Sequence, residues 1–533
     1  MASWEIHTTG IIEWLEEYEG PRFHAILSDP PYALISIAKR FGPGQAPAQE
    51  GEDGRYQRLS SGFMGQTWDG FESLEAYQDW VASWSTLLIS KALHPGAVCL
   101  FFGGTRTFHH LGVGLERGGF EIVDSVLIPW LHGQGFPKSH DVSKGMDKAA
   151  GAEREVIENR PMGGKYAEAS KFARNKQGYP KVPRPKDNYW TGEILGDPVT
   201  NDAKHWDGYG TALKPAWEPV YVCRAPRGDM TFAELAVQYG TGALNIDGAR
   251  IGNESVEIGI SKAHLGGRYG SGRGGRGSSE TYTSEGRWPA NLVLTHHEAC
   301  VKVGEYEVKG RTLNRYPSHG MGGSFAFYAE DHRGEDYESE KMPPDLVDLY
   351  ACVPGCPVRE LDDQAGLSGG GTVGSRKGEA SAERTYEHEG GTDFAMKPGA
   401  RRPGADGPSR FFYTAKAGRA EKDKGLEQFY WRRTNDGWER ISEEEWAELD
   451  ESLRGRGCIH PTVKPLALLR YLATLVLPPV REEARRLLVP FSGSGSEMIA
   501  AIQAGWNRVE GVEMAETYTE MAEARIRATI GML

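Results

Sequence analysis

The chain has 533 residues, of which 39% are hydrophobic and 69 are glycines, so a large core should alternate with long Gly-rich loops. The formal net charge of −13 excludes a uniformly basic surface but allows local basic patches for nucleic acid. No apolar run approaches the ~20 residues that span a bilayer, no signal-peptide pattern is found, and the 6 cysteines are too scattered for a disulfide scaffold. These features predict a cytoplasmic protein with two or more domains.

The N-terminal 226 residues alternate between predicted strands and helices. Strands are expected near residues 4–6 and at 25–27, 97–102, 122–128 and 217–223, and the last of these should pair back onto 122–128. Helices are expected at 11–18, 71–93 and 105–116. This alternation indicates an α/β fold with a mostly parallel sheet. Residues 134–210 are polar and rich in Gly and Lys, and we interpret them as an inserted loop region.

Regular periodicity is sparse in the middle of the chain and returns near its C-terminal end. Residues 227–455 contain one predicted acidic helix at 442–453, and no repeat of fixed period is found. The last eighty residues or so are predicted to form elements in the order helix 466–477, strand 487–489, helix 497–504, strand 509–512 and a helix ending near 529.

One candidate site is Asp29-Pro30-Pro31-Tyr32, which ends the apolar run that starts at Phe23. The prolines stop the strand because they cannot donate to a ladder, so Asp29 is placed at the carboxyl end of a strand, where open α/β sheets bind ligands. A carboxylate, a rigid carbonyl and an aromatic face suit a planar ring that carries an exocyclic amine. By itself, the tetrapeptide is equally consistent with a simple strand-ending turn.

A second candidate site follows the strand at 487–489. Phe491-Ser492-Gly493-Ser494-Gly495 leads into a helix, where backbone can approach a ligand closely. Glu513 ends the next strand about twenty residues later, a spacing at which a carboxylate accepts hydrogen bonds from ribose hydroxyls. No third glycine completes a dinucleotide fingerprint, which favours a nucleoside cofactor without pyrophosphate. An ordinary β–α turn with a solvated Glu513 stays open on these residues alone.

Together with the segment His460-Pro461-Thr462-Val463-Lys464-Pro465, these two motifs resemble the S-adenosylmethionine-dependent DNA amino-methyltransferases, in the motif order of the β group. The resemblance covers residues 1–226 and 458–533. Residues 62–69, 135–139 and 213–219 are similar to segments of phage- or prophage-encoded members, which also suggests a restriction–modification context.

The resemblance implies a Rossmann-like methyltransferase sheet with a circularly permuted motif order and a large, irregular insertion. The catalytic half would be residues 1–226, the target-recognition region 227–455 and the cofactor-binding half 456–533. S-adenosyl-L-methionine would be held by Phe491, Ser492, Gly493, Gly495, Glu513, Thr462 and Lys464, with Glu513 on the ribose and the last two residues at the methionine end. An adenine flipped out of double-stranded DNA would be held for N6 methylation by Asp29, Pro30, Pro31 and Tyr32.

Two other functions stay open. Cytosine-N4 methylation uses the same site design, although Asp29 favours adenine N6 and Ser in its place would favour cytosine. A non-catalytic DNA-binding protein on this fold is the other alternative, because Gly10 and Val489 stand where related chains usually carry acidic residues. We expect no attached nuclease, no membrane association and a nucleoid-associated enzyme that is able to act as a monomer.

The middle region supplies basic residues and a metal-ligand pattern. Candidates for contacts to phosphates or guanine edges are Arg268, Arg273, Arg276, Arg287, Lys397, Arg401, Arg402, Arg410 and Lys416, although arginines among glycines are more often simply solvated. His296-x-x-x-Cys300 and Cys352-x-x-x-Cys356 have spacings used by structural zinc, with His297 as an alternative ligand. Otherwise these cysteines are buried or free thiols.

Overall fold

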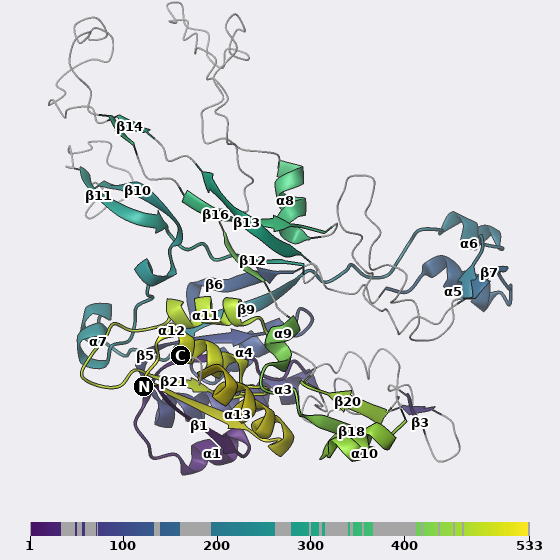
Figure 1. The fold of residues 1–533 in the computed structure, drawn as a ribbon, viewed down its shortest axis with the longest axis horizontal. Helices are drawn as coiled ribbons and strands as arrows, with labels where there is room; N and C mark the ends of the chain where they lie inside the picture. Colours follow the sequence, from purple (N-terminus) through teal and green to yellow (C-terminus); the bar gives the residue numbers. More distant parts are fainter. Residues whose placement is uncertain are drawn as a thin grey trace, which may run out of the picture.

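One nine-stranded β-sheet organises the protein. Figure 1 shows the fold around it. The computed structural model describes residues 2–33, 48–50, 56–58, 71, 73–132, 139–159, 193–261, 279–297, 300–308, 312–314, 339–341, 345–353, 356–365, 412–416, 419–434, 437–450, 453–460 and 463–530. Across the sheet the strands are β1 (Ser3–Thr8), β22 (Arg508–Glu513), β21 (Arg486–Val489), β2 (Phe23–Ser28), β5 (Leu93–Phe102), β9 (Trp217–Arg224), β6 (Glu121–Leu131), β12 (Val293–His296) and β17 (Tyr413–Lys416).

The pairing confirms the predicted α/β fold with a mostly parallel sheet. All neighbouring pairs from β1 to β5 are parallel, and β9 is antiparallel to both of its neighbours. The predicted return of residues 217–223 onto 122–128 is confirmed, with Leu127 opposite Tyr221. Strands β21 and β22 lie between β1 and β2, so segments from opposite ends of the sequence are direct neighbours.

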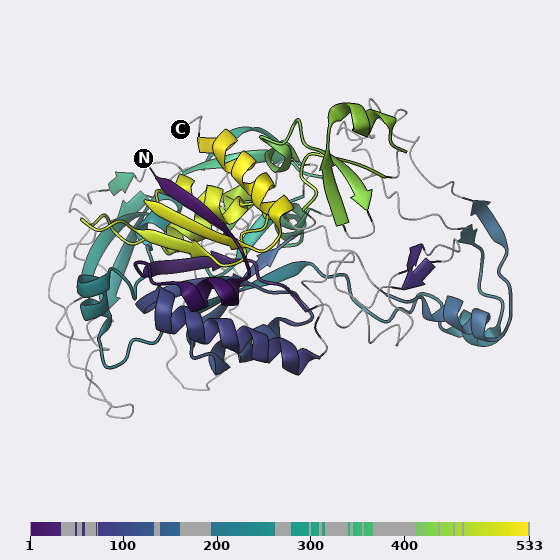
Figure 2. The same cartoon turned by 90° about the horizontal axis from the view of Figure 1, so that it is seen from below.

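Helices cover both faces of the sheet, and Figure 2 shows the early and the late helices on opposite sides of it. One face packs against α1 (Ile11–Glu17), α3 (Leu74–Leu87) and α4 (Phe108–Arg117). The other face packs against α11 (Leu466–Leu475), α12 (Ser496–Ala504) and α13 (Glu516–Ile530). Alternation along the strands divides the core, because Leu100 faces the late helices and Phe101 the early ones.

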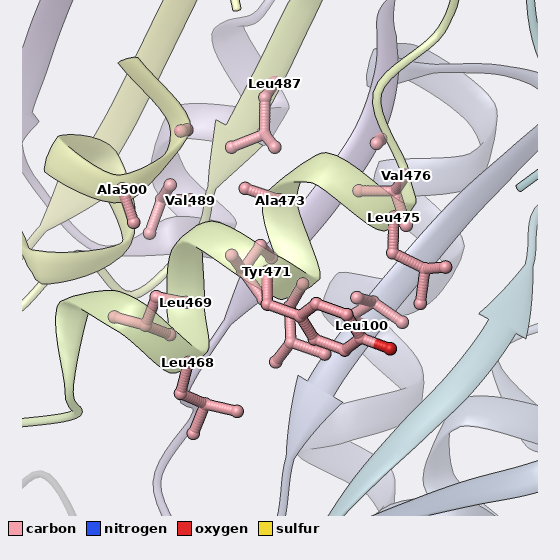
Figure 3. Close-up of a cluster of buried hydrophobic side chains, with 14 of the residues drawn as sticks. Leu100, Leu468, Leu469, Tyr471, Ala473, Leu475, Val476, Leu487, Val489 and Ala500 are labelled. Carbon is pink, nitrogen blue, oxygen red and sulfur yellow. The ribbon is translucent and has the colours of Figure 1, made fainter. Parts of the chain in front are cut away.

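The core beneath α11 consists mainly of leucine, alanine and valine side chains, as Figure 3 shows. Leu468, Leu469 and Leu472 are fully buried against strand residues such as Leu487 and Val489. Burial of each such leucine contributes about 1.5–3 kcal/mol relative to exposure. This packing fixes β21, and therefore the loop that follows it, relative to β2.

The predicted helix at 71–93 ends earlier than expected. α3 stops at Leu87, one π-helical turn, η3 (Leu88–Ala92), follows, and β5 already begins at Leu93. The carbonyl groups left open at this helix end accept hydrogen bonds from Arg22, whose guanidinium contacts Ile89 at 3.2 Å and also Ser90 and Leu93. A distant side chain thus stabilises a terminus that local sequence does not reveal.

The predicted loop region at 134–210 contains regular structure in its described part. The elements are α5 (Val142–Ala149), β7 (Val156–Asn159), β8 (Glu193–Leu195) and α6 (Asn201–His205). Buried Asp147 joins them by accepting hydrogen bonds from the Thr200 amide at 2.9 Å, the Val199 amide at 3.1 Å and Arg154 Nε at 2.6 Å. Burial acts to raise the pKa of Asp147, but these donors outweigh it and hold that pKa below its usual value.

The region 227–455 contributes both to the sheet and to projecting hairpins. β12 and β17 form the far edge of the sheet, so the sheet extends beyond the two expected methyltransferase halves. Peripheral to it lie the hairpin strands β10 (Ile251–Ser261) with β11 (Ser279–Arg287), β13 (Val301–Val308) with β16 (Asp345–Ala351), and β14 (Thr312–Asn314) with β15 (Ser339–Lys341) (Figure 1). β12 and β17 have four residues each, and such short strands carry too little pattern for sequence-based prediction.

Several short elements complete the fold. Helices α7 (Phe232–Tyr239), α8 (Pro357–Ala365) and α9 (Arg419–Asp423) belong to the same region, as does the 3₁₀ turn η4 (Asp247–Ala249). The acidic helix expected at 442–453 is α10 (Glu443–Glu448), which lies beside the small sheet of β18 (Tyr430–Thr434), β19 (Gly437–Ile441) and β20 (Arg454–Arg456). A separate pair is formed by β3 (Ala48–Glu50) and β4 (Tyr56–Arg58). Within the described ranges, no helix is long and apolar enough to cross a membrane.

Candidate active site

A cavity of about 570 Å³ opens at the carboxyl ends of the central strands. Its wall combines the segment after β2, the loop after β21, the end of β22 and the start of α1. The lining residues are Thr9, Gly10, Ile11, Ile12, Glu13, Asp29, Pro30, Pro31, Tyr32, Phe71, Trp80, His460, Lys464, Pro490, Phe491, Ser492, Gly493, Ser494, Ser496, Glu497, Val512, Glu513, Met514 and Tyr518. The two motifs that are far apart in sequence therefore share one wall.

The segment after β2 is fixed by contacts from α3 and from the turn between β5 and α4. The Tyr77 hydroxyl on α3 donates to the Pro31 carbonyl at 2.8 Å, and the Thr107 hydroxyl donates to the Tyr32 carbonyl. Gly104 lies behind the Tyr32 ring, where an added Cβ would be 2.9 Å from Cδ2 of that ring. The next residue, Ala33, has a φ of 50°, in the left-handed region that non-glycine residues rarely adopt. These constraints hold Asp29 and Tyr32 in one orientation.

Asp29 is the centre of a charged cluster at the floor of the cavity. Lys464 Nζ donates to Asp29 Oδ2 at 2.6 Å, and the Tyr32 hydroxyl donates to Asp29 Oδ1 at 2.6 Å. Glu218 on β9 lies 3.4 Å from Lys464 Nζ and accepts from the Tyr32 hydroxyl at 3.3 Å. Burial acts to lower the pKa of Lys464, but the charges of Asp29 and Glu218 outweigh it and raise that pKa above its usual value. The ammonium is thus permanently charged and fixes the carboxylate of Asp29.

A second carboxyl group, Glu497, lies at the cavity with only 5% of its surface exposed. Burial, followed by the nearby charge of Asp29, raises the pKa of Glu497 to about 7, against the lowering effect of Lys464 and Arg525. A carboxyl group with this pKa changes its charge near neutral pH. In the sequence, Glu497 looked like an ordinary acidic residue in the first turn of a helix.

The loop between β21 and α12 requires glycine at two positions. Gly493 and Gly495 have φ values of +48° and +76°. An added Cβ would lie 2.8 Å from His460 Nε2 at Gly493 and 2.9 Å from Ala522 Cβ at Gly495. Because both positions need a left-handed backbone and close approach, the loop lies flat against its neighbours. The loop lines the cavity through Gly493 and through Phe491, Ser492 and Ser494.

The Glu513 carboxylate closes this loop from the next strand. Its Oε2 accepts from the Gly493 amide at 2.9 Å, and its Oε1 accepts from the Ala515 amide at 2.9 Å. Burial raises the pKa of Glu513, although the hydrogen bonds from these amides oppose the effect. Glu513 thus sets the loop and still lines the cavity.

Arg525 on α13 supports the same loop from behind and was not predicted. Its side chain is buried, and Nη1 donates to the Ser494 carbonyl at 2.5 Å, to Ser494 Oγ at 2.9 Å and to Ser496 Oγ at 2.8 Å. A signal was present in the sequence, because Arg525 interrupts an otherwise mostly apolar helix face that includes Met521, Ala522 and Ile526.

Aromatic rings form one side of the cavity, and Trp80 and Phe71 were also not predicted. Trp80 on α3 lies 5.6 Å from the Phe491 ring and 5.2 Å from the Phe71 ring, measured between centroids. Tyr518 on α13 packs edge-on against His460 at 4.6 Å. Such a wall suits a planar heterocycle, because rings stack on it without specific hydrogen bonds.

Most of the predicted site residues line the cavity. The predicted residues in the lining are Asp29, Pro30, Pro31, Tyr32, Phe491, Ser492, Gly493, Glu513 and Lys464. Gly495 forms the N-cap of α12 directly behind them. The predicted residues that lie outside the described ranges are Thr462, Arg268, Arg273, Arg276, Lys397, Arg401, Arg402 and Arg410. Arg287 ends β11 and Lys416 ends β17 at the edge of the sheet.

Val489 and Gly10, which stand where the family resemblance implies acidic residues, have different surroundings. Val489 is fully buried in the core and does not belong to the cavity lining. Gly10 does line the cavity, and the carboxylate of Glu13, three residues later, lies so close that an added Cβ on Gly10 would collide with Glu13 Oε2. An acidic group is therefore present beside Gly10, although it comes from α1 rather than from the turn.

The predicted metal ligands also come together, away from the cavity. His296, Cys300, Cys352 and Cys356 have their candidate ligand atoms within 4.8 Å of one another. His297, the alternative ligand, is not part of this group.

No protein-family model matches the chain, and no curated protein matches it. Among solved structures, TTHA0409 from Thermus thermophilus, provisionally described as a DNA modification methylase, matches 100% of this chain and 97% of its own length, at 10% identity and a TM-score of 0.31. M1.HpyAVI in complex with SAM matches with coverages of 98% and 99%, 10% identity and a TM-score of 0.29. The cytosine-N4-specific PvuII DNA methyltransferase matches 100% of this chain and 94% of its own length, at 9% identity and a TM-score of 0.30. Scores of this size carry no functional argument, so the case for an activity rests on the residues of the cavity.

Proposed function

We propose that this protein is an S-adenosyl-L-methionine-dependent DNA methyltransferase that modifies adenine N6 in double-stranded DNA. The observation that carries the proposal is the shared cavity, in which Asp29 and Tyr32 face the glycine loop at Gly493 and the Glu513 carboxylate. One half suits an exocyclic amine on a planar ring, and the other half suits a nucleoside cofactor.

The cavity has the features that S-adenosyl-L-methionine requires. Its size is that of a pocket for a drug-sized ligand. The flat glycine loop admits close contact, Glu513 is placed for ribose hydroxyls, and Phe491 belongs to an aromatic wall for the purine. The charges also fit, because Glu13, Asp29 and Glu513 line a cavity that would receive a ligand with a cationic sulfur and a cationic amino group.

The order of the strands supports the same function. A run of parallel strands followed by one antiparallel strand, β9, between β5 and β6 is what we expect of a Rossmann-like methyltransferase sheet. The cofactor loop follows β21, which lies beside β2 although it comes about 460 residues later. This arrangement agrees with the permuted motif order of the β group, with residues 227–455 as the proposed target-recognition region.

The proposed chemistry depends on how the chain holds the target amine. The N6 lone pair of adenine is delocalised into the ring, so the amine is a weak nucleophile. Asp29 and the Pro30 carbonyl accept the two N–H bonds and localise the lone pair, and Tyr32 stacks on the flipped base. The cofactor supplies an electrophilic methyl group. Positioning of the amine therefore provides most of the rate enhancement.

Lys464 and Tyr32 support this arrangement by holding the two oxygens of Asp29. Each carboxylate oxygen has a second lone pair, which remains available for an amine. Thr462 and Lys464 are still the proposed lining of the methionine end. Lys464 contacts both Asp29 and Glu218, and it lines the cavity together with Asp29.

The base can be identified by single-molecule sequencing of DNA from cells that express the protein. N6-methyladenine at one short motif supports the proposal. Detection of N4-methylcytosine would show that cytosine, and not adenine, is the target base. Retained DNA binding without any mark would show a non-catalytic protein and overturn the proposed activity.

Replacement of Asp29 tests the assignment of the site. Asp29→Ala should lower methylation by at least about 100-fold, because it removes an acceptor that acts on the reacting amine. Binding of S-adenosyl-L-methionine, measured by calorimetry, should remain detectable. The matched control is Asp79→Ala, which removes an aspartate side chain that is 64% exposed on α3 and lies outside the cavity lining. Normal turnover in the Asp29 variant would refute the role of this residue.

A further inference from the structure

The second cluster of reactive side chains in the described part of the protein lies at the edge of the sheet, where four element ends meet. His296 is the last residue of β12, and Cys300 directly precedes β13. Cys352 directly follows β16, and Cys356 directly precedes α8. Figure 1 shows β12, β13, β16 and α8 beside one another at this edge. Residues separated by more than 50 positions thus place three thiols and one imidazole together.

The distances within the cluster match those between ligands of one tetrahedral ion. His296 Nδ1 lies 3.3 Å from Cys352 Sγ and 3.5 Å from Cys356 Sγ. Zinc–sulfur and zinc–nitrogen bonds of about 2.3 and 2.0–2.1 Å place a nitrogen about 3.6 Å from a sulfur and two sulfurs about 3.8 Å apart. Since all four ligand atoms lie within 4.8 Å of one another, an ion at their centre needs only small side-chain adjustments.

The ligand side chains are buried and held in place. Cys300 and Cys356 are fully buried, and His296 is buried as well. The His296 ring is held by stacking on Tyr350, with the two centroids 3.9 Å apart. A fixed imidazole among buried thiols is the kind of support that metal sites use around their ligands.

The apolar core around the cluster is small in the described part of the protein. Its buried residues other than cysteine are Leu294, Val353 and Val358, and the partly buried residues packed against them are Leu131, Leu292, Tyr350, Leu361 and Phe412. Val301 and Val303 of the β13–β16 hairpin are 58% and 59% exposed. An isolated two-stranded hairpin is marginally stable in water, so a metal ion that joins it to β12 would add stability.

We propose that His296, Cys300, Cys352 and Cys356 bind one structural zinc ion. The protein supplies all four ligands, so the ion has no open position for a substrate, and its role is to stabilise the fold. It joins the β13–β16 hairpin and α8 to β12, which is a strand of the same sheet that carries the cavity. The region proposed to recognise DNA is thereby fixed to the catalytic sheet. This site is independent of the proposed methyl transfer.

Metal analysis of the full-length protein, purified under reducing conditions without chelator, tests the site. We expect about one zinc per chain, and a loss of at least about tenfold in Cys352→Ser and Cys356→Ser, because removal of one ligand opens a structural site. Cys458→Ser is the matched control, since Cys458 lies outside the cluster and should leave the zinc content unchanged.

A measurement on the unaltered chain avoids the risk that the serine variants fail to fold. Protein produced with cobalt in place of zinc should show intense visible bands of a tetrahedral ion and charge-transfer bands from thiolate ligands. Less than about half an equivalent of zinc, with no such cobalt bands, would overturn the proposal. A disulfide among Cys300, Cys352 and Cys356 in the purified protein, detected by mass spectrometry without reduction, would also overturn it.

Discussion

The buried carboxyl group of Glu497 should destabilise the folded protein at alkaline pH. The pKa of Glu497 rises from its ordinary value of 4.5 to about 7, chiefly because of burial and then because of the charge of Asp29. Below pH 4.5 the group is protonated in both the folded and the unfolded protein. Between pH 4.5 and 7 only the unfolded protein releases the proton, so stability falls as pH rises. Above pH 7 the loss is complete and amounts to about 3 kcal/mol, at about 1.36 kcal/mol for each pH unit of the difference.

Glu497→Gln removes this titration and keeps the shape of the side chain. At pH 8 the variant should be more stable than the parent protein by about 3 kcal/mol, and at pH 5 by less than about 1 kcal/mol. Urea unfolding followed by tryptophan fluorescence at both pH values measures the difference. Glu17→Gln on the exposed side of α1 is the control and should show no pH-dependent gain. A Glu497→Gln variant that is no more stable than the parent at pH 8 would contradict the buried, protonated state of this carboxyl group.

Three further substitutions test the support of the cavity. Glu513→Gln should weaken S-adenosyl-L-methionine binding by about tenfold or more in calorimetry, because a charged acceptor for hydroxyls and for the Gly493 amide is lost; unchanged affinity would argue against the ribose contact. Arg525→Met should lower the melting temperature by about 2–8 °C and weaken cofactor binding, since it removes the donors that hold Ser494; a variant with parental stability would show that the loop holds itself. Tyr32→Phe should reduce kcat by about tenfold with little change in KM for DNA, because the ring remains and only the hydroxyl contacts with Asp29, Glu218 and Lys464 are lost; a change confined to KM would contradict this role.

The sequence was most informative where local chemistry determines structure. Prolines after an apolar strand predicted Asp29 at a strand end, and glycines before a helix predicted close approach at Gly493, which lines the cavity. Both conclusions depend on a few neighbouring residues, and the structure brings the two segments together. The structure also brings together the four metal-ligand candidates that the spacing indicated, and His297, which the sequence offered as an alternative ligand, is not part of the group.

Features that depend on distant packing could not be predicted. Arg525 interrupts an apolar helix face in the sequence, but its partner Ser494 becomes known only from the structure. The elevated pKa of Glu497 arises from burial and then from the charge of Asp29, which is remote in sequence. The edge strands β12 and β17 are four residues long each, and their parallel pairing with each other and of β12 with β6 depends on segments far apart along the chain.

The position of β21 between β22 and β2 has a consequence for how the protein is made. β2 pairs with β5 on one side and with β21 on the other. β21 is synthesised about 460 residues after β2. At ribosomal rates of about 5–20 residues per second, one edge of β2 waits roughly 25–90 s for this partner. The strand carries the fully buried side chains Phe23, Ile26 and Leu27, so an unpaired apolar edge persists throughout elongation. Folding of the sheet is therefore completed after translation of most of the chain, and the nascent protein depends on protection from aggregation until β21 arrives.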